Sequence, residues 1–256
     1  SGGTTGGGGS IIWSDSIQAG ASPWGFYIGC EKPIGGNYVN CSDANGANVT
    51  RVSDPAGGGG YAIRHYINPS NGGARAHLGV YTVDNTALAN QLQQHGEVWI
   101  EHEIYVPSPL PSTPDVGPWV LFTNTQSTAP MGADRRHNNP GLYFCTQALP
   151  VCGSGNTGKL ALRNFVNTVF EGPSTVSFPA NQWVKVQVHF TWSTSPVPIT
   201  YYINGVQALQ ITTSTKNPGH TVFEWYTNLY AWGDTITPNP IIRYTKNVRI
   251  SNAFIQ

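Results

Sequence analysis

The chain has 256 residues, of which only 10% are charged, and its formal net charge is zero. It has no basic cluster that could neutralise several phosphates, so we expect no nucleic-acid partner. It has no apolar run long enough to cross a bilayer, so we expect no membrane segment. Abundant Gly, Pro, Ser, Thr and Asn are typical of secreted β proteins with many turns, and this length suits a single domain.

The first ten residues, SGGTTGGGGS, cannot pack a core. We interpret residues 1–10 as a Gly-rich linker or an expression remnant, which could tether an upstream module. Residues 11–256 are then expected to form one domain. No signal peptide is visible, so the chain is expected to be a mature form.

From residue 11 onward the chain alternates short β-like runs with clusters of turn residues. The predicted strand regions are residues 61–68, 74–82, 97–106, 119–124, 141–146, 159–166, 183–192, 199–211, 223–232 and 241–251. Within 199–211, Asn204 and Gly205 predict a tight hairpin, because both tolerate positive φ. Only residues 86–96 are expected to be helical.

So many strands cannot remain one open sheet without exposing their edges. We therefore predict an all-β fold, a two-sheet antiparallel β-sandwich of jelly-roll type with a curved concave groove and one short helix.

The cysteines fall into two pairs that are close in sequence, Cys30 with Cys41 and Cys145 with Cys152. Two short-loop disulfides are the simplest interpretation, and they indicate an oxidising, extracellular location. A zinc site is the alternative, but neither pair has the tight spacing of a zinc knuckle. Asn40 and Asn48 lie in patterns that allow glycosylation.

Four of the predicted strands alternate between an apolar face and a face of ionisable and aromatic side chains. A merely solvated face usually has fewer such groups, so we expect these side chains to line a substrate groove. In particular, His77, Glu101, His189 and Tyr230 are predicted to converge. The polar faces consist of Arg75, His77 and Tyr81; Trp99, Glu101, Glu103 and Tyr105; Lys185, Gln187 and His189; and Glu224, Tyr226, Asn228, Tyr230 and Trp232.

These residues are compatible with two reactions. β-Elimination at a uronic acid needs a group that neutralises the sugar carboxylate, a base such as His and an acid such as Tyr. The candidates are Arg75, His77, Lys185, Gln187, His189 and Tyr230. Hydrolysis needs two carboxylates, and Glu101 and Glu103 lie on one strand face with Cα atoms about 6.5–7 Å apart. The alternative for this pair is a solvated face balanced by Lys185 or Arg75.

Aromatic side chains on the same faces, Trp99, Tyr105, Tyr226, Tyr230 and Trp232, could stack on sugar rings, although some aromatic residues must serve core packing. Together with Lys185, Gln187 and Asn228 they are the predicted substrate-binding residues.

The order of motifs resembles that of secreted jelly-roll polysaccharide lyases of the glucuronan lyase and heparin lyase I kind, from about residue 11 to the end. The matching segments are WSDSIQAGASPWGF, RAHL, VWIEHEIYVPSPLP, WVKVQVHFTW followed by YYINGVQ, NLYAWGD and IIRYTKNVRIS. This resemblance implies that Tyr230 is the catalytic acid, or both acid and base. Arg75 stands where such enzymes have a catalytic His or a charge-neutralising Arg, and His77 replaces a Glu. It also implies a structural calcium, with Asp15 as a candidate ligand. Jelly-roll glucanases are the second choice.

The sequence therefore predicts a secreted, monomeric polysaccharide-cleaving enzyme that needs no cofactor for catalysis. A lyase acting on a weakly charged uronic-acid-containing glycan is favoured, because no positive field is present to steer a heavily anionic one. The alternatives are a glycoside hydrolase that uses Glu101 and Glu103, a non-catalytic carbohydrate-binding module, and a structural subunit assembled through edge strands.

Overall fold

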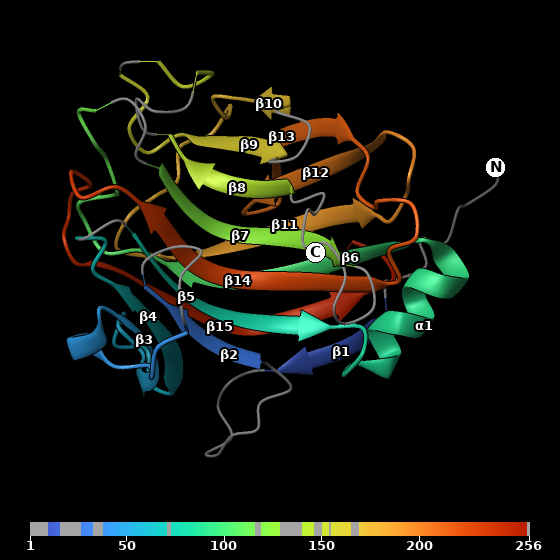
Figure 1. Cartoon of the computed structure of the whole chain (residues 1–256), viewed down its shortest axis with the longest axis horizontal. Coiled ribbons are helices and arrows are strands. Elements are labelled where there is room, and N and C mark those ends of the chain that lie inside the picture. The colour runs from blue at the N-terminus through green and yellow to red at the C-terminus, as the bar shows by residue number, and fades with distance from the viewer. Residues whose placement is uncertain are drawn as a thin grey trace, which may run out of the picture.

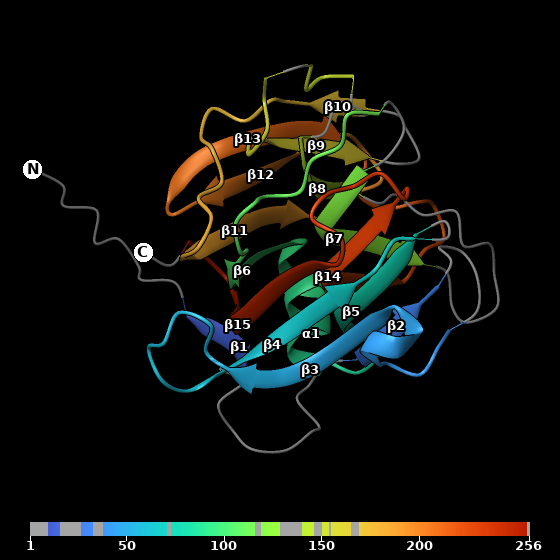
Figure 2. The same ribbon diagram turned by 90° about the vertical axis from the view of Figure 1, so that its left-hand side faces the viewer.

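Two antiparallel sheets pack face to face in the computed structural model (Figure 1). The structure describes residues 10–15, 27–32, 38–70, 73–115, 119–128, 140–145, 150–153, 155–164 and 169–254. The turned view shows the strands of the two sheets as separate layers (Figure 2). The predicted jelly-roll β-sandwich is confirmed. Of the predicted linker, only Ser10 is within the described residues.

Sheet A has eight strands in the described part of the chain. Seven follow in hydrogen-bonded order and the eighth, β1 (Ile11–Asp15), also pairs with β15. The order is β13 (Val206–Thr213), β12 (Val197–Ile203), β11 (Trp183–Thr191), β6 (Glu97–Tyr105), β15 (Ile241–Ser251), β4 (Tyr61–Ile67) and β3 (Ala47–Ser53).

Sheet B contains seven described strands. Their order is β10 (Val169–Glu171), β9 (Leu160–Asn164), β8 (Pro140–Phe144), β7 (Trp119–Thr128), β14 (Val222–Trp232), β5 (Ala74–Tyr81) and β2 (Tyr27–Glu31).

Every predicted strand region contains a strand, and the hairpin region contains two. Four further strands, β1, β2, β3 and β10, were not predicted from the sequence. β10 has three residues and β2 contains a glycine and a cysteine, so neither shows a clear alternation. Residue 146 of one predicted region and residues 165 and 166 of another lie outside the described part.

The core lies between the sheets and takes one face of each central strand. In β6, Val98, Ile100 and Ile104 are buried in it, and in β14, Trp225 and Leu229 are buried in it. This alternation places the intervening residues of both strands on the outer faces of the sandwich.

The predicted helix is confirmed as α1 (Thr86–His95). The side chain of Asn85 accepts a hydrogen bond from the Leu88 amide at its start, and Gly96 ends it with a φ of 69°. A 3-10 turn, η1 (Asp43–Asn45), precedes β3. No helix among the described residues is long and apolar enough to cross a membrane.

The predicted hairpin at Asn204 and Gly205 is also confirmed. These residues have φ values of 50° and 80°, which a two-residue turn with positive φ requires. The Asn204 side chain also accepts a hydrogen bond from the Lys185 amide, which ties the turn to β11.

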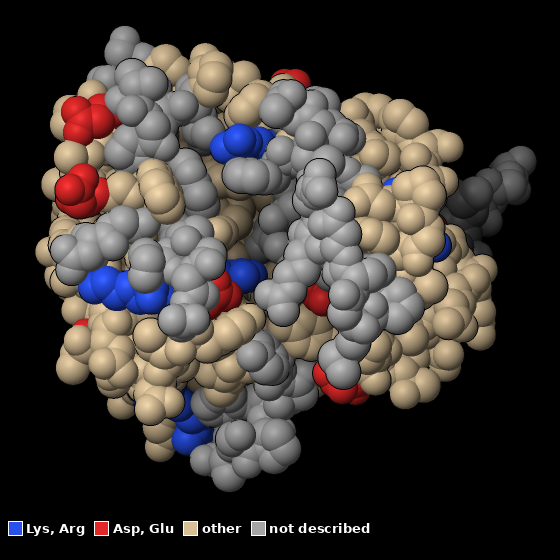
Figure 3. Space-filling model, in the orientation of Figure 1, with Lys and Arg blue, Asp and Glu red and all other residues tan. Residues whose placement is uncertain are grey.

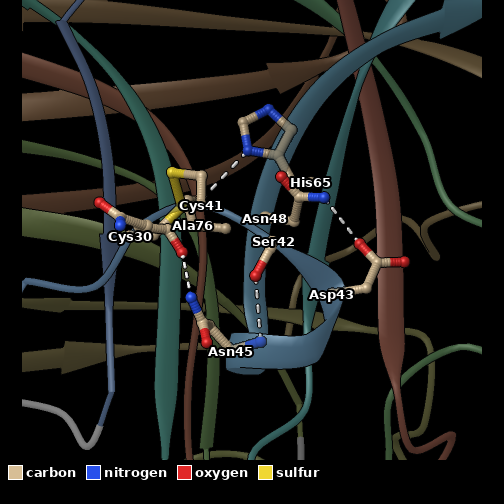
Figure 4. Close-up of a disulfide and its surroundings, with 9 residues drawn as sticks. Cys30, Cys41, Ser42, Asp43, Asn45, Asn48, His65 and Ala76 are labelled. Carbon is tan, nitrogen blue, oxygen red and sulfur yellow. Dashed lines mark hydrogen bonds between the residues drawn. A yellow bond between two sulfur atoms is a disulfide. The ribbon is translucent and has the colours of Figure 1, made fainter.

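Both predicted disulfides are present, Cys30–Cys41 and Cys145–Cys152. The first links β2, the last strand in the order of sheet B, to the segment before η1 (Figure 4). The second belongs to a small cluster on the outer face of sheet B that also contains Leu121.

Replacing both Cys30 and Cys41 by Ser should lower the free energy of unfolding by about 2–4 kcal/mol, because the bridge restricts the unfolded chain. Guanidinium denaturation without a reducing agent measures this change. Adding dithiothreitol should remove the stability contributed by this bridge from the wild type but not from the double variant, which lacks the bridge. An unchanged unfolding midpoint would show that the bridge adds no stability.

Candidate functional site

The two sheets present two different outer faces. His102 of β6 and Thr227 of β14 meet in the core, where His102 Nδ1 lies 3.1 Å from Thr227 Oγ1. The residues on either side of His102 therefore point away from the core on sheet A, and those on either side of Thr227 point away from it on sheet B.

The prediction that His77, Glu101, His189 and Tyr230 converge is wrong. His77 and Tyr230 lie on the outer face of sheet B, in β5 and β14, whereas Glu101 and His189 lie on the outer face of sheet A, in β6 and β11. The sequence periodicity gave the correct face of each strand, but it could not give the sheet to which each strand belongs. Lys185 and Gln187 of β11 are likewise separated from Arg75.

On sheet A the two candidate carboxylates are bound to different cations. Glu101 lies 3.3 Å from Arg249 Nη1 and 3.7 Å from Lys185 Nζ. Glu103 accepts a hydrogen bond from Asn247 and lies 3.9 Å from Lys246. Lys185 balances Glu101, as the alternative to a hydrolytic pair predicted, but Glu101 is buried and not solvated, and Arg75 lies on the other sheet.

The aromatic residues of this face are engaged with their neighbours. The Trp99 ring stacks on His189 with centroids 4.5 Å apart, and His189 also contacts Glu97 at 2.9 Å. The rings of Tyr105 and Trp183 are 5.7 Å apart. The outer face of sheet A is therefore a network of side chains that hold one another.

On sheet B the register places four candidate residues in two adjacent cross-strand pairs. Arg75 of β5 lies opposite Tyr230 of β14, and His77 lies opposite Asn228. Tyr226 follows, opposite Gly79. Directly opposite side chains on one face of an antiparallel pair are close enough to contact each other.

Arg75 is at the centre of this group. Its guanidinium lies over the rings of Tyr226 and Tyr230, 4.7 and 5.2 Å from their centroids. Its Nη1 lies 3.3 Å from a carboxylate oxygen of Glu31. Nε and Nη2 are buried and have no hydrogen-bond partner among the described residues.

Glu31 was not predicted as a site residue. It lies opposite Arg75 in β2 and is buried, whereas Arg75 is partly buried. Its position directly after Cys30 was the available signal, because the disulfide fixes this end of β2.

Burial controls the protonation of this group. Burial, and then the nearby Arg75 and His65, hold the pKa of His77 well below its usual value, so the imidazole is neutral at pH 7. Burial also raises the pKa of Tyr230, and Glu31 adds to this rise while Arg75 opposes it. Tyr230 is therefore a protonated phenol beside a neutral imidazole.

Tyr226 lies on the same face of sheet B, opposite Gly79 and against the ring of His77. Its ring meets His77 edge to face at 5.3 Å, and its hydroxyl donates to Glu224 at 2.5 Å. Burial, Tyr81 and Glu224 raise its pKa well above the usual value. Tyr226 therefore packs the site and stays uncharged.

The remaining predicted residues can be placed briefly. Trp232 lies two residues beyond Tyr230 on the same strand and is 46% exposed. Figure 3 has the orientation of Figure 1, with sheet B toward the viewer, and shows basic and acidic side chains side by side on that face. Asp15, the candidate calcium ligand, lies in β1 opposite Val248. The described residues contain no cluster of three or more His, Cys, Asp and Glu side chains, and the calcium expectation stays a prediction.

Comparison with known protein families identifies one match, to the polysaccharide lyase model, over residues 20–245. No curated protein matches the chain.

Similar solved structures include a GlcNAcα1-4Gal-releasing endo-β-galactosidase from Clostridium perfringens. It has a TM-score of 0.54 and 10% identity, over 98% of this chain and 64% of that one. A galectin-like protein from Bacillus subtilis has a TM-score of 0.50 and 8% identity, over 98% and 99% of the chains. An alginate lyase from a Chlorella virus has a TM-score of 0.47 and 8% identity, over 81% and 93%. At these identities the similarity concerns the fold alone.

Gly79→Ala should disturb the packing around Tyr226. A Cβ at Gly79 would lie 2.9 Å from Cε1 of Tyr226 and 3.0 Å from the Tyr81 hydroxyl, so the rings must move. We expect a loss of about 1–3 kcal/mol of stability, measured by urea denaturation. Gly58→Ala is the matched control, because its added methyl would meet nothing closer than 3.9 Å. Equal stability of the two variants would contradict the packing described.

The neutral state of His77 should make stability depend on pH. Below about pH 6.5 an unfolded His binds a proton that folded His77 does not, so stability falls as pH falls from there toward the folded pKa. For one His the slope approaches about 1.4 kcal/mol per pH unit. Urea denaturation between pH 7 and pH 5 should give a shallower slope for His77→Gln than for the wild type. Parallel slopes would mean that His77 titrates normally in the folded protein.

Proposed function

Since the chain belongs to the polysaccharide lyase family, we propose that it cleaves a uronic-acid-containing polysaccharide by β-elimination at the outer face of sheet B. The observation that carries this proposal is the pairing of Arg75 with Tyr230 and of His77 with Asn228 across β5 and β14. These four side chains supply the three functions that elimination needs, and they do so on one face.

Arg75 is the group that binds the sugar carboxylate. Its Nε and Nη2 are buried donors without a partner among the described residues, and a guanidinium matches a carboxylate with two parallel hydrogen bonds. We propose that the Asn228 amide, in the neighbouring pair, adds a further donor. Neutralising the carboxylate makes the proton on the adjacent carbon removable.

His77 is the base and Tyr230 the acid. His77 is unprotonated at neutral pH, and a carboxylate bound at Arg75 offsets the charge that lowers its basicity. His77 takes the proton from the carbon beside the carboxylate, and the electron pair forms the new carbon–carbon double bond. The bond to the glycosidic oxygen breaks, and that oxygen takes the Tyr230 proton. Solvent then returns the proton from His77 to Tyr230.

The charge of the site favours a weakly charged glycan. Arg75 is already balanced by Glu31, and the formal net charge of the chain is zero, so no strong positive field attracts a polyanion. Trp232, exposed next to Tyr230, offers a ring on which a neighbouring sugar can stack. The two disulfides fit an extracellular protein, and we propose secretion.

A glycan-binding module without catalysis is the second candidate. The exposed Trp232, with Tyr230 two residues away on the same face, favours a binding module, because such a module binds sugars by stacking them on aromatic rings. Hydrolysis by Glu101 and Glu103 is the third, and it would take place on the opposite face of the molecule from Tyr230.

Tyr230→Phe should lower kcat on a polyuronate by about 10²–10⁴-fold, because the leaving oxygen loses its proton donor. The assay follows the ultraviolet absorbance of the unsaturated sugar that elimination produces, across glucuronan, alginate and neutral glucans. Binding of the same glycan, measured by calorimetry, should stay within about threefold of the wild type.

Glu101→Gln is the matched control on sheet A, and its elimination rate should equal that of the wild type. Shortened chains without the unsaturated product, lost in Glu101→Gln and kept in Tyr230→Phe, would establish hydrolysis instead. Glycan binding without any shortened product in the wild type would establish the binding module.

A further inference from the structure

A buried arginine lies in the core beneath the proposed site. Arg243 of β15 is 1% exposed, and the polar residues around it are also buried. They come from β4, β6, β14 and β15 and comprise His65, His102, Thr227 and Thr245.

The guanidinium of Arg243 reaches across the sandwich from sheet A to sheet B. Its Nη1 donates to the carbonyl of Phe122 in β7 at 2.8 Å, and its Nη2 donates to Thr227 Oγ1 in β14 at 2.5 Å. Nη2 also lies 3.3 Å from His65 Nε2. Among the described residues no carboxylate forms an ion pair with Arg243.

A cation buried without a carboxylate weakens a fold, and apolar residues of similar size are often equally or more stabilising there. Burial lowers the pKa of Arg243 well below its usual value, which reflects the same cost. Stability alone therefore does not account for an arginine at this position.

The contacts of Arg243 fall where the ladder of sheet B is irregular. Thr227 pairs with Thr123, but the next partners are Tyr230 and Leu121, so β14 advances three residues while β7 advances two. β7 in turn advances two residues, from Leu121 to Thr123, while β8 advances one. Phe122 lies at both bulges, and Arg243 binds its carbonyl.

The bulge in β14 spans the proposed site. Thr227 precedes it, Asn228 lies within it, and Tyr230 resumes the pairing. A bulge changes the direction of the side chains beside it, so the atoms that hold it also aim those side chains. Arg243 holds both strands at this point, through Thr227 on β14 and Phe122 on β7.

The same cluster also reaches β5. His65 Nδ1 lies 3.1 Å from the carbonyl oxygen of Ala76, the residue between Arg75 and His77 (Figure 4). A neutral His65 with its proton on Nδ1 donates to Ala76 and accepts from Arg243 Nη2, so one tautomer satisfies both contacts. Burial and Arg243 hold the pKa of His65 well below its usual value, in agreement with this state.

We propose that Arg243 is a positioning residue of the site on sheet B. From inside the core it fixes the bulge that aims Asn228 and Tyr230, and through His65 it fixes the backbone between Arg75 and His77. It never contacts the substrate. The catalytic part of this proposal rests on the proposed function, whereas the mechanical part does not.

Arg243→Met tests the proposal, because Met fills similar space and makes none of the hydrogen bonds. We expect the variant to fold, with kcat for elimination about 10–100-fold lower and KM within about threefold of the wild type, since misdirected groups cost turnover more than binding. Arg243→Lys keeps a donor and should recover part of the loss. Arg64→Met is the matched control on the neighbouring strand, because Arg64 pairs with Asp43 away from the core, and its kcat should be unchanged.

Hydrogen exchange supplies a measurement that needs no activity. Amides 227–230 should exchange at least about tenfold faster in Arg243→Met, while amides of β11 keep their wild-type rates. If Arg243→Met does not fold, Thr227→Val removes the acceptor on β14 and should give the same local exchange and the same kcat loss. Unchanged exchange at 227–230 in a folded variant would overturn the proposal, as would wild-type kcat. If amides 227–230 exchange faster in Arg243→Met but the wild type cleaves no polyuronate, the proposed function is refuted. The role of Arg243 in holding the bulge is then still supported.

Discussion

Each central strand of this sandwich gives one face to the core, and this constraint fixes what the other face can offer. In β14, Thr227 and Leu229 point inward, so Asn228 and Tyr230 must point outward together. In β5 the same rule places Arg75 and His77 outward. The site is therefore the complement of the core: the packing that buries the apolar half of two neighbouring strands also brings the polar half together.

The fold could be predicted from the sequence because its signals are local. Strand alternation, the turn at Asn204 and Gly205, and the short spacing of the cysteine pairs each lie within about a dozen residues of chain. The site could be predicted only in part, because its assembly depends on strand order. β5 and β6 follow each other in sequence and both have polar faces, yet they belong to different sheets. The resemblance to lyases selected Tyr230 and Arg75, which do lie together.

Arg243 shows a different limit of sequence analysis. In the run IIRYTKNVRIS it shares the period-two face of Ile241 and Thr245, and all three are buried, so a charge lies on a strand face that belongs to the core. An arginine there reads as a conflict with the apolar pattern. Sheet B explains the conflict, because its bulged strands present two acceptors, the Phe122 carbonyl and Thr227 Oγ1, that an apolar side chain could not satisfy.

Glu31, the partner of Arg75, stands on the last strand in the order of sheet B, and a covalent bridge one residue away ties that strand to the loop before β3. An outer strand opens more readily than a central one, and the disulfide, together with the bridge between Glu31 and Tyr38, holds this carboxylate beside Arg75. Reducing the Cys30–Cys41 bridge would therefore loosen the carboxylate that balances the charge of Arg75.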